Sequence, residues 1–188
     1  MKTNKNIGLY FGTFNPIHIG HLAIANHMAE FSELDEIWLV VTPHNPFKKK
    51  STLLDNHHRL EMVRLATEHY PKLKPSTVEF DLPQPNYTVN TLAVLEEKYP
   101  DYMFNLIMGE DNYSNLNKWK KNDYIKKNYE IIVYPRGKNK NREIPHNNEL
   151  ISISSSQIRL MIKNGKQING LIPSCIEKEI LEKKYYSK

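Results

Sequence analysis

The apolar positions of this 188-residue chain fall into short continuous runs that alternate with longer segments of helical spacing. A run of four to eight apolar residues is typical of a buried strand, whereas apolar positions three or four apart indicate the inner face of a helix. The runs predict strands over residues 7–11, 36–42, 74–80, 102–108, 129–134 and 150–153. The helical spacing predicts helices over residues 20–31, 55–70, 88–98, 155–163 and 174–184.

Strands and helices follow one another in this prediction, and such alternation favours an α/β fold in which helices cover both faces of a parallel sheet. No internal repeat or linker interrupts the pattern, so we expect a single domain over residues 1–188. In parallel sheets, ligands bind beyond the carboxyl ends of the strands. Candidate chemistry is therefore expected in the segments that directly follow the predicted strands.

The composition excludes several classes of protein. Hydrophobic residues make up 39% of the chain and charged residues 25%, which is ordinary globular usage rather than that of a disordered chain. No apolar stretch approaches the ~20 residues that a membrane span needs, so we expect no membrane partner. The one cysteine, Cys175, cannot form an internal disulfide, and we interpret it as structural. A reducing cytoplasm is the simplest location.

The net charge of +5 favours anionic ligands, but it does not say which. A nucleic-acid-binding module gathers Lys and Arg with exposed aromatic residues on one face. The lysines here are dispersed along the chain, so we expect no nucleic-acid partner and keep that interpretation only as an alternative. Residues 137–148 are the most polar stretch and predict a surface loop.

A glycine and two histidines follow the first predicted strand. Gly12 lets the backbone approach a ligand closely, and His18 and His21 lie three residues apart where a helix begins. On a helical turn this spacing places both imidazoles on one side. The helix start adds backbone N–H donors and the positive end of the helix dipole. The segment thus predicts a phosphate site, although a pair of structural histidines explains the spacing equally well.

This segment is not one of the common phosphate-binding motifs. It lacks the glycines of the G-x-G-x-x-G dinucleotide fingerprint and the G-K-[ST] of the Walker loop. Two histidines with no cysteine or carboxylate nearby also make a poor zinc site. We therefore expect no protein-bound metal at this loop.

A serine-rich turn precedes the helix that is predicted over residues 155–163. Serine hydroxyls and N–H groups at a helix start can bind an anion, and Arg159, one turn later, can add a charge-assisted contact. Taken alone, an ordinary serine N-cap beside a surface arginine is the simpler interpretation. The turn gains its significance together with the histidine loop.

The two segments together resemble the signatures of the H-x-G-H nucleotidyltransferase superfamily. Residues 12–21, which read G-T-F-N-P-I-H-I-G-H, are similar to its G-T-F-D-P-x-H-x-G-H motif. Residues 153–159, which read I-S-S-S-Q-I-R, are similar to its I-S-S-T-x-I-R motif. The resemblance implies a Rossmann-like fold and a single triphosphate site on which both segments converge.

Further segments resemble the bacterial nicotinate-nucleotide adenylyltransferases, and the resemblance extends from Ile7 to Ile180. These segments are H-R-L-E-M at residues 58–62, N-Y-T-V-N-T-L at 86–92, G-E-D at 109–111 with Leu116 and Trp119 following, and L-I-P at 171–173. The positions that depart from the family pattern are Phe11, Asn15, Phe47 and Arg136.

The resemblance implies which residues bind each substrate. ATP would be bound by Gly12, Thr13, Phe14, His18, His21, Lys48, Gly109, Asp111, Ser155 and Arg159. The nicotinate mononucleotide would be bound by Asn15, Thr88, Asp111 and Trp119. His18 and His21 would be the catalytic residues, because they stabilise charge on the transferred phosphoryl group. Trp119 offers a flat ring for stacking, and Thr88 can hydrogen-bond a ring carboxylate.

The implied reaction joins AMP from ATP to nicotinate mononucleotide and releases pyrophosphate, as a step in NAD biosynthesis. The attacking phosphate oxygen is already anionic near neutral pH, since the second pKa of a phosphate is ~6, so no general base is required. Catalysis would rest on positioning and charge stabilisation, with Mg²⁺ bridging phosphate oxygens mostly through water. A pantetheine-phosphate type of nucleotidyltransferase and a non-catalytic nucleotide sensor stay open as alternatives. A homo-oligomer is compatible with the sequence.

Overall fold

Five parallel strands form one sheet in the computed structural model, which describes residues 4–43, 53–134 and 153–187. The spatial order of the strands is β3-β2-β1-β4-β5. Their bounds are β1 Lys5–Gly12, β2 Glu36–Val41, β3 Leu73–Ser76, β4 Tyr102–Gly109 and β5 Ile131–Tyr134. Every pairing between neighbouring strands is parallel, which confirms the sheet type that the alternation of elements predicts.

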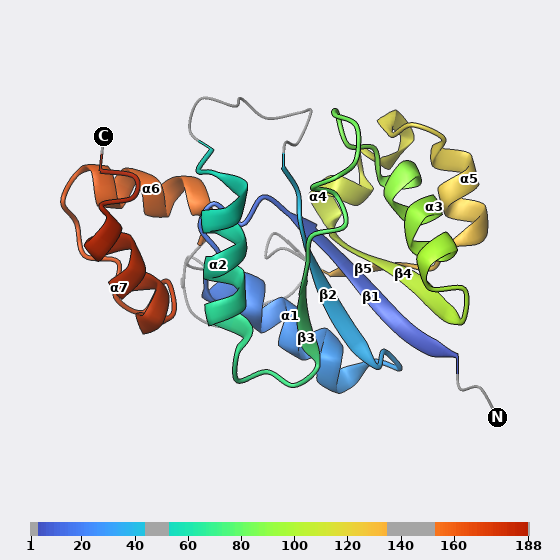
Figure 1. Cartoon of the computed structure of the whole chain (residues 1–188), viewed down its shortest axis with the longest axis horizontal. Coiled ribbons are helices and arrows are strands. Elements are labelled where there is room, and N and C mark those ends of the chain that lie inside the picture. Colours follow the sequence, from blue (N-terminus) through green and yellow to red (C-terminus); the bar gives the residue numbers. More distant parts are fainter. Residues whose placement is uncertain (1–3, 44–52, 135–152, 188) are drawn as a thin grey trace, which may run out of the picture.

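Helices cover both faces of this sheet, as Figure 1 shows. One face packs against α1 (Ile19–Phe31), α2 (Asn56–Thr67), α6 (Ser155–Lys163) and α7 (Ser174–Lys183). The other face packs against α3 (Thr88–Lys98) and α5 (Asn122–Asn128), with the short α4 (Glu110–Tyr113) and the 3₁₀ helix Leu116–Lys118 beside them. Successive strand residues alternate between the two cores: Leu9 belongs to the α3 side, whereas Tyr10 belongs to the α1 side.

The strand order places a crevice above the centre of the sheet. The chain builds outward from β1 to β2 and β3, and then crosses back so that β4 pairs with the other edge of β1. Connections leave β1 and β4 in opposite directions at such a switch point, which opens a ligand crevice at the carboxyl ends of the two strands. Gly12 and Gly109 are the last residues of these two strands.

The third strand is shorter than the sequence predicts. The sequence predicts a strand over residues 74–80, but β3 ends at Ser76 and the chain turns, with the Phe80 N–H donating to the Thr77 carbonyl at 2.8 Å. This turn carries Glu79 into the interior, where it is 2% exposed. The helix predicted over 55–70 also ends early, at Thr67, while its predicted cap Asp55 accepts from the His57 N–H at 2.8 Å.

Two other predicted segments fall largely outside the described residues. The polar loop over 137–148 lies entirely outside them, and so do most residues of the strand predicted over 150–153. Of that strand only Ile153 is described, and it is not in a strand. The helices between residues 110 and 128 were not predicted, because polar residues interrupt their apolar spacing.

A fully buried arginine holds the loops at the ligand end of the sheet. The Arg59 guanidinium, on α2, is 0% exposed and donates to the carbonyls of Thr13, Thr42 and Pro43. It also donates to the Leu54 carbonyl and the Asn56 side chain. Burial lowers the pKa of Arg59 to about 10, so the group stays charged at neutral pH. One side chain thus connects the segments after β1 and β2 to the start of α2.

Arg59→Lys should destabilise the fold by about 2 kcal/mol. An ammonium has three donors in place of the five of a guanidinium, so buried carbonyls lose their partners. The free energy of unfolding in urea measures the loss. Arg64→Lys, at an exposed position of the same helix, is the matched control and should change stability by no more than about 0.5 kcal/mol. Equal effects of the two substitutions on the free energy of unfolding would contradict the role of Arg59 in holding these loops.

Candidate active site

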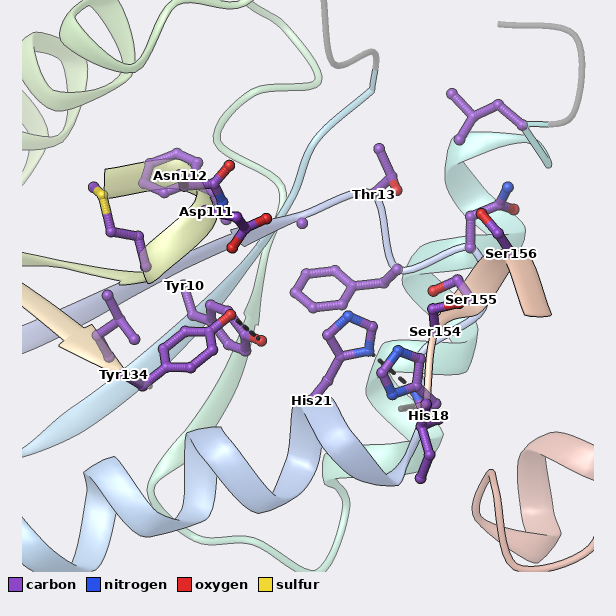
Figure 2. Close-up of a pocket in the computed structure, with 18 of the residues that line it drawn as sticks. Tyr10, Thr13, His18, His21, Asp111, Asn112, Tyr134, Ser154, Ser155 and Ser156 are labelled. Atoms are coloured by element: carbon purple, nitrogen blue, oxygen red, sulfur yellow. Dashed lines mark hydrogen bonds between the residues drawn. The ribbon is translucent and has the colours of Figure 1, made fainter. Parts of the chain in front are cut away.

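Two adjoining cavities occupy the crevice at the carboxyl ends of β1 and β4. The first, of about 520 Å³, contains both predicted phosphate segments, and Figure 2 shows the side chains that line it. The second, of about 360 Å³, contains the predicted ring-binding residues. The two cavities share Phe11, Gly12, Thr13, Asn112 and Trp119 in their walls. A ligand that fills one can therefore meet a ligand that fills the other.

The two histidines stack on each other at the start of α1. His18 is the extended residue that precedes the helix, and its backbone N–H donates to Nδ1 of His21 at 3.2 Å. The two rings are stacked, with centroids 3.7 Å apart (Figure 2). Because Nδ1 of His21 accepts this hydrogen bond, the neutral ring carries its own proton on Nε2. His21 therefore presents an N–H donor from a ring whose orientation is fixed.

Aromatic packing sets the height of the histidine rings above the sheet. The Phe14 ring contacts the His21 ring edge-on at 5.1 Å and the Tyr10 ring at 5.9 Å. Phe14 is 1% exposed and left-handed, with φ 43°. A Cβ at Gly12 would lie 2.8 Å from the Phe14 ring, so only glycine fits there. Phe14 thus supports the site with its ring, and Gly12 makes room for that ring.

The serine-rich turn is attached directly to the loop after β1. Ser155 Oγ donates to the Pro16 carbonyl at 2.9 Å, and Arg159 Nη1 donates to the Asn15 carbonyl at 2.7 Å. Ser154 caps α6 by accepting from the Gln157 N–H at 3.2 Å. Burial lowers the pKa of the half-buried Arg159, which stays cationic. The structure thus brings His18, His21 and Arg159 to one cavity, the juxtaposition on which the sequence interpretation depends.

The end of β4 supplies a carboxylate to the same cavity. Asp111 lies on α4 and lines the cavity, opposite the start of α6 (Figure 2). A Cβ at Gly109 would lie 2.6 Å from Oδ1 of Asp111, so the glycine leaves space for this carboxylate. Gly109 itself lines neither cavity. Below Asp111, the hydroxyls of Tyr10 and Tyr134 are hydrogen-bonded at 3.3 Å.

The second cavity combines an aromatic wall with positive charge. Trp119 is half-buried and lines this cavity together with Thr88, the first residue of α3. Two lysines that flank Trp119 in sequence, Lys118 and Lys120, also line the cavity. Lys120 Nζ lies 4.6 Å from the centre of the Tyr87 ring. The cavity can thus hold a flat ring that carries negative charge.

Sequence reasoning missed a buried acid in the second cavity. Oε1 of Glu79 accepts from the Thr91 hydroxyl at 2.7 Å, and the Glu79 carbonyl accepts from Asn86 Nδ2 at 3.1 Å. Oε2 of Glu79 and Oδ1 of Asn86 are buried and have no hydrogen-bond partner among the described residues. Burial raises the pKa of Glu79, and the hydrogen bond from Thr91 partly opposes the rise. An acidic residue between Val78 and Phe80, in a segment predicted as a buried strand, was the available signal.

Asn15, a predicted mononucleotide-binding residue, lines the first cavity and not the second. Asn15 is 3% exposed, and its Oδ1 accepts from the Leu54 N–H at 3.2 Å and from the Tyr186 hydroxyl at 2.8 Å. Lys48, Phe47 and Arg136 lie outside the described residues. Within the described ranges, no three His, Cys, Asp or Glu side chains are grouped so that they could hold a metal ion. None of the helices described is long and apolar enough to cross a membrane.

Comparisons with known proteins agree on one family. A family model described as cytidylyltransferase-like matches residues 9–161. Proteins from Flavobacterium psychrophilum and Christiangramia forsetii that are named as nicotinate-nucleotide adenylyltransferases are each 58% identical to the chain. Each alignment covers 97% of this chain and 99% of the relative.

Solved structures support the fold. A nicotinate-nucleotide adenylyltransferase structure from Vibrio parahaemolyticus matches with a TM-score of 0.77 at 19% identity, covering 98% of this chain and 96% of that chain. The nicotinic acid mononucleotide adenylyltransferase of Plasmodium falciparum, complexed with NaAD, matches with a TM-score of 0.74 at 20% identity. That alignment covers 97% of this chain and 98% of that chain.

Glu79→Gln should gain stability relative to the unsubstituted protein as the pH rises. The pKa of Glu79 is higher in the folded state than in the unfolded state, so the folded state binds more protons above the ordinary glutamate value of about 4.3. The unsubstituted protein therefore loses stability as the pH rises from there, whereas glutamine does not titrate. Urea unfolding at pH 5 and pH 8 measures the difference. Glu97→Gln, exposed on α3, is the control, and a pH-independent difference for Glu79→Gln would refute the prediction.

Proposed function

The chain belongs to the nicotinate-nucleotide adenylyltransferase family, and on that premise we propose which of its residues bind each substrate. The reaction joins AMP from ATP to nicotinate mononucleotide, giving deamido-NAD and pyrophosphate, in NAD biosynthesis. One observation carries the proposal: His18, His21 and Arg159 line a single cavity at the switch point of the sheet. ATP binds in this first cavity, and the mononucleotide binds in the second.

The triphosphate lies between the starts of α1 and α6. Both helices direct the positive ends of their dipoles at this space, which favours an anion. His21 donates from Nε2, and Ser155 with Arg159 contacts the leaving pyrophosphate from the other side. Lys48, which lies outside the described residues, is a further proposed cation for the triphosphate. Gly12, Thr13 and Phe14 form the wall behind the phosphates.

The mononucleotide lies against Trp119, with its phosphate directed toward the wall that both cavities share. The nicotinate ring stacks on the indole, and the ring carboxylate meets Thr88 at the start of α3. Lys118 and Lys120 add positive charge to the same cavity, which favours a carboxylate over a neutral amide. These three features support a preference for nicotinate mononucleotide over nicotinamide mononucleotide.

Catalysis proceeds by in-line attack of the mononucleotide phosphate on the α-phosphate of ATP. The nucleophile is already anionic, so the site needs donors rather than a base. His18 and His21 stabilise the charge that develops on the transferred phosphoryl group. Mg²⁺, when bound with ATP, neutralises charge on the phosphate oxygens, and the Asp111 carboxylate in the cavity wall suits this ion.

The lone exposed thiol Cys175 lies outside both cavities and suits a reducing compartment.

Pyrophosphate release from ATP with each mononucleotide tests the acceptor assignment. We expect faster release with nicotinate mononucleotide than with nicotinamide mononucleotide. Trp119→Ala should raise the KM for nicotinate mononucleotide about tenfold, because the loss of ring stacking amounts to roughly 1.4 kcal/mol. Tyr124→Ala, at an exposed position on α5 outside both cavities, is the control. An unchanged KM in Trp119→Ala would place the ring elsewhere.

His21→Ala should lower kcat by roughly two to three orders of magnitude, the usual scale for the loss of one transition-state donor. The fold should survive, since the His21 ring is only half-buried. Steady-state pyrophosphate release with both substrates saturating measures the effect. His27→Ala, on the exposed side of the same helix, should leave kcat unchanged. Near-normal turnover in His21→Ala would remove its assigned role.

A further inference from the structure

The segment after α7 returns to the loop after β1, 171 residues away in sequence. Lys184 ends α7 in the left-handed conformation, and the Tyr185 N–H donates to the Ile180 carbonyl at 3.0 Å, which reverses the chain. Tyr186 is also left-handed, with φ 62°. This conformation is unfavourable for a bulky residue and persists only where the surroundings enforce it. The backbone conformation therefore fixes the position of the Tyr186 side chain.

In this position Tyr186 contacts the side chain of Asn15. The Tyr186 hydroxyl donates to Asn15 Oδ1 at 2.8 Å, and the Leu54 N–H donates to the same oxygen at 3.2 Å. A carbonyl oxygen has two lone pairs, so these two donors satisfy it. Asn15 is 3% exposed, and its position therefore depends on these partners rather than on water.

The main chain of Asn15 in turn holds Arg159. The Asn15 carbonyl accepts from Nη1 of Arg159 at 2.7 Å, and Nη2 contacts the Ser156 hydroxyl at 3.2 Å. Arg159 and Arg59 are the two cations that act on the buried Tyr186 phenol, and both favour its ionised form, although burial outweighs them and raises its pKa. The phenol is thus a neutral donor that can satisfy Asn15 beside two guanidinium groups. A chain of direct contacts runs from Tyr186 through Asn15 to Arg159.

We propose that Tyr186 is a positioning residue for the triphosphate site, because its hydroxyl fixes Asn15 and Asn15 orients the Arg159 guanidinium. This inference rests on the proposed binding of ATP next to Arg159. It assigns a role to a residue outside every motif in the sequence and outside both cavities. Tyr186 acts on ATP binding through Arg159 and has no part in binding the mononucleotide.

Tyr186→Phe tests the role, with Tyr185→Phe as a matched control on the adjacent residue. Tyr185 is 8% exposed and thus more buried than Tyr186, but its hydroxyl has no hydrogen-bond partner among the described residues. Calorimetric titration with α,β-methylene-ATP measures ATP affinity without turnover. We expect Tyr186→Phe to weaken this affinity about tenfold and to raise the KM for ATP similarly, while the KM for the mononucleotide stays within twofold. Tyr185→Phe should change neither the affinity for α,β-methylene-ATP nor the KM for either substrate.

A double-mutant cycle with Arg159→Ala separates positioning from general stability. If Tyr186 acts through Arg159, Tyr186→Phe should have no further effect on ATP affinity in the Arg159→Ala background. Full additivity, or an equal effect of Tyr186→Phe on both substrates, would overturn the positioning role. If Arg159→Ala binds α,β-methylene-ATP weakly and Tyr186→Phe binds it normally, the positioning role of Tyr186 is overturned and the triphosphate site is not. Normal binding by Arg159→Ala would overturn the proposed triphosphate site as well.

Discussion

The ligand-binding end of this sheet depends on how donors hold the carbonyls of the loop after β1. Three carbonyls of the loop accept hydrogen bonds: Thr13 from Arg59, Asn15 from Arg159 and Pro16 from Ser155. Among the described residues, neither guanidinium has a carboxylate within ion-pair distance. Carbonyl dipoles only partly compensate a buried cation. The loop therefore carries net positive potential before any ligand arrives, and an anion complements it.

This arrangement explains why a site without a base or a covalent nucleophile suits the reaction. Catalysis of phosphoryl transfer rests almost entirely on positioning and on electrostatic stabilisation of the charge on the transferred group. The first cavity gathers two helix starts and an arginine around the histidine pair, while the second adds two lysines beside Trp119. Because Thr13 and Asn112 belong to both walls, the two phosphates can meet where these positive fields overlap.

The sequence patterns predicted the features that depend on neighbouring residues in the chain. They missed the features that depend on contacts between residues far apart in the sequence. The histidine loop and the serine turn were found because each is a short motif at the end of a predicted strand. Glu79 was read as part of a strand, because the turn that buries it depends on packing against α3. Arg59 and Tyr186 matter only through partners up to 171 residues away, which no local period reveals. The motif around Arg59 was recognised by resemblance, but its burial was not predicted.

Asn15 shows how a departure from the family pattern is accommodated by the surrounding residues. The resemblance places aspartate at this position, where a carboxylate would lie in a pocket that already holds the Tyr186 hydroxyl and the Leu54 N–H. An amide oxygen accepts both hydrogen bonds and adds no negative charge at this position, where Asn15 is only 3% exposed. It therefore leaves the positive charge of Arg159 uncancelled at the cavity wall. Asparagine is thus compatible with an anion next to Arg159, and the loop geometry follows from the hydrogen bonds rather than from an ion pair.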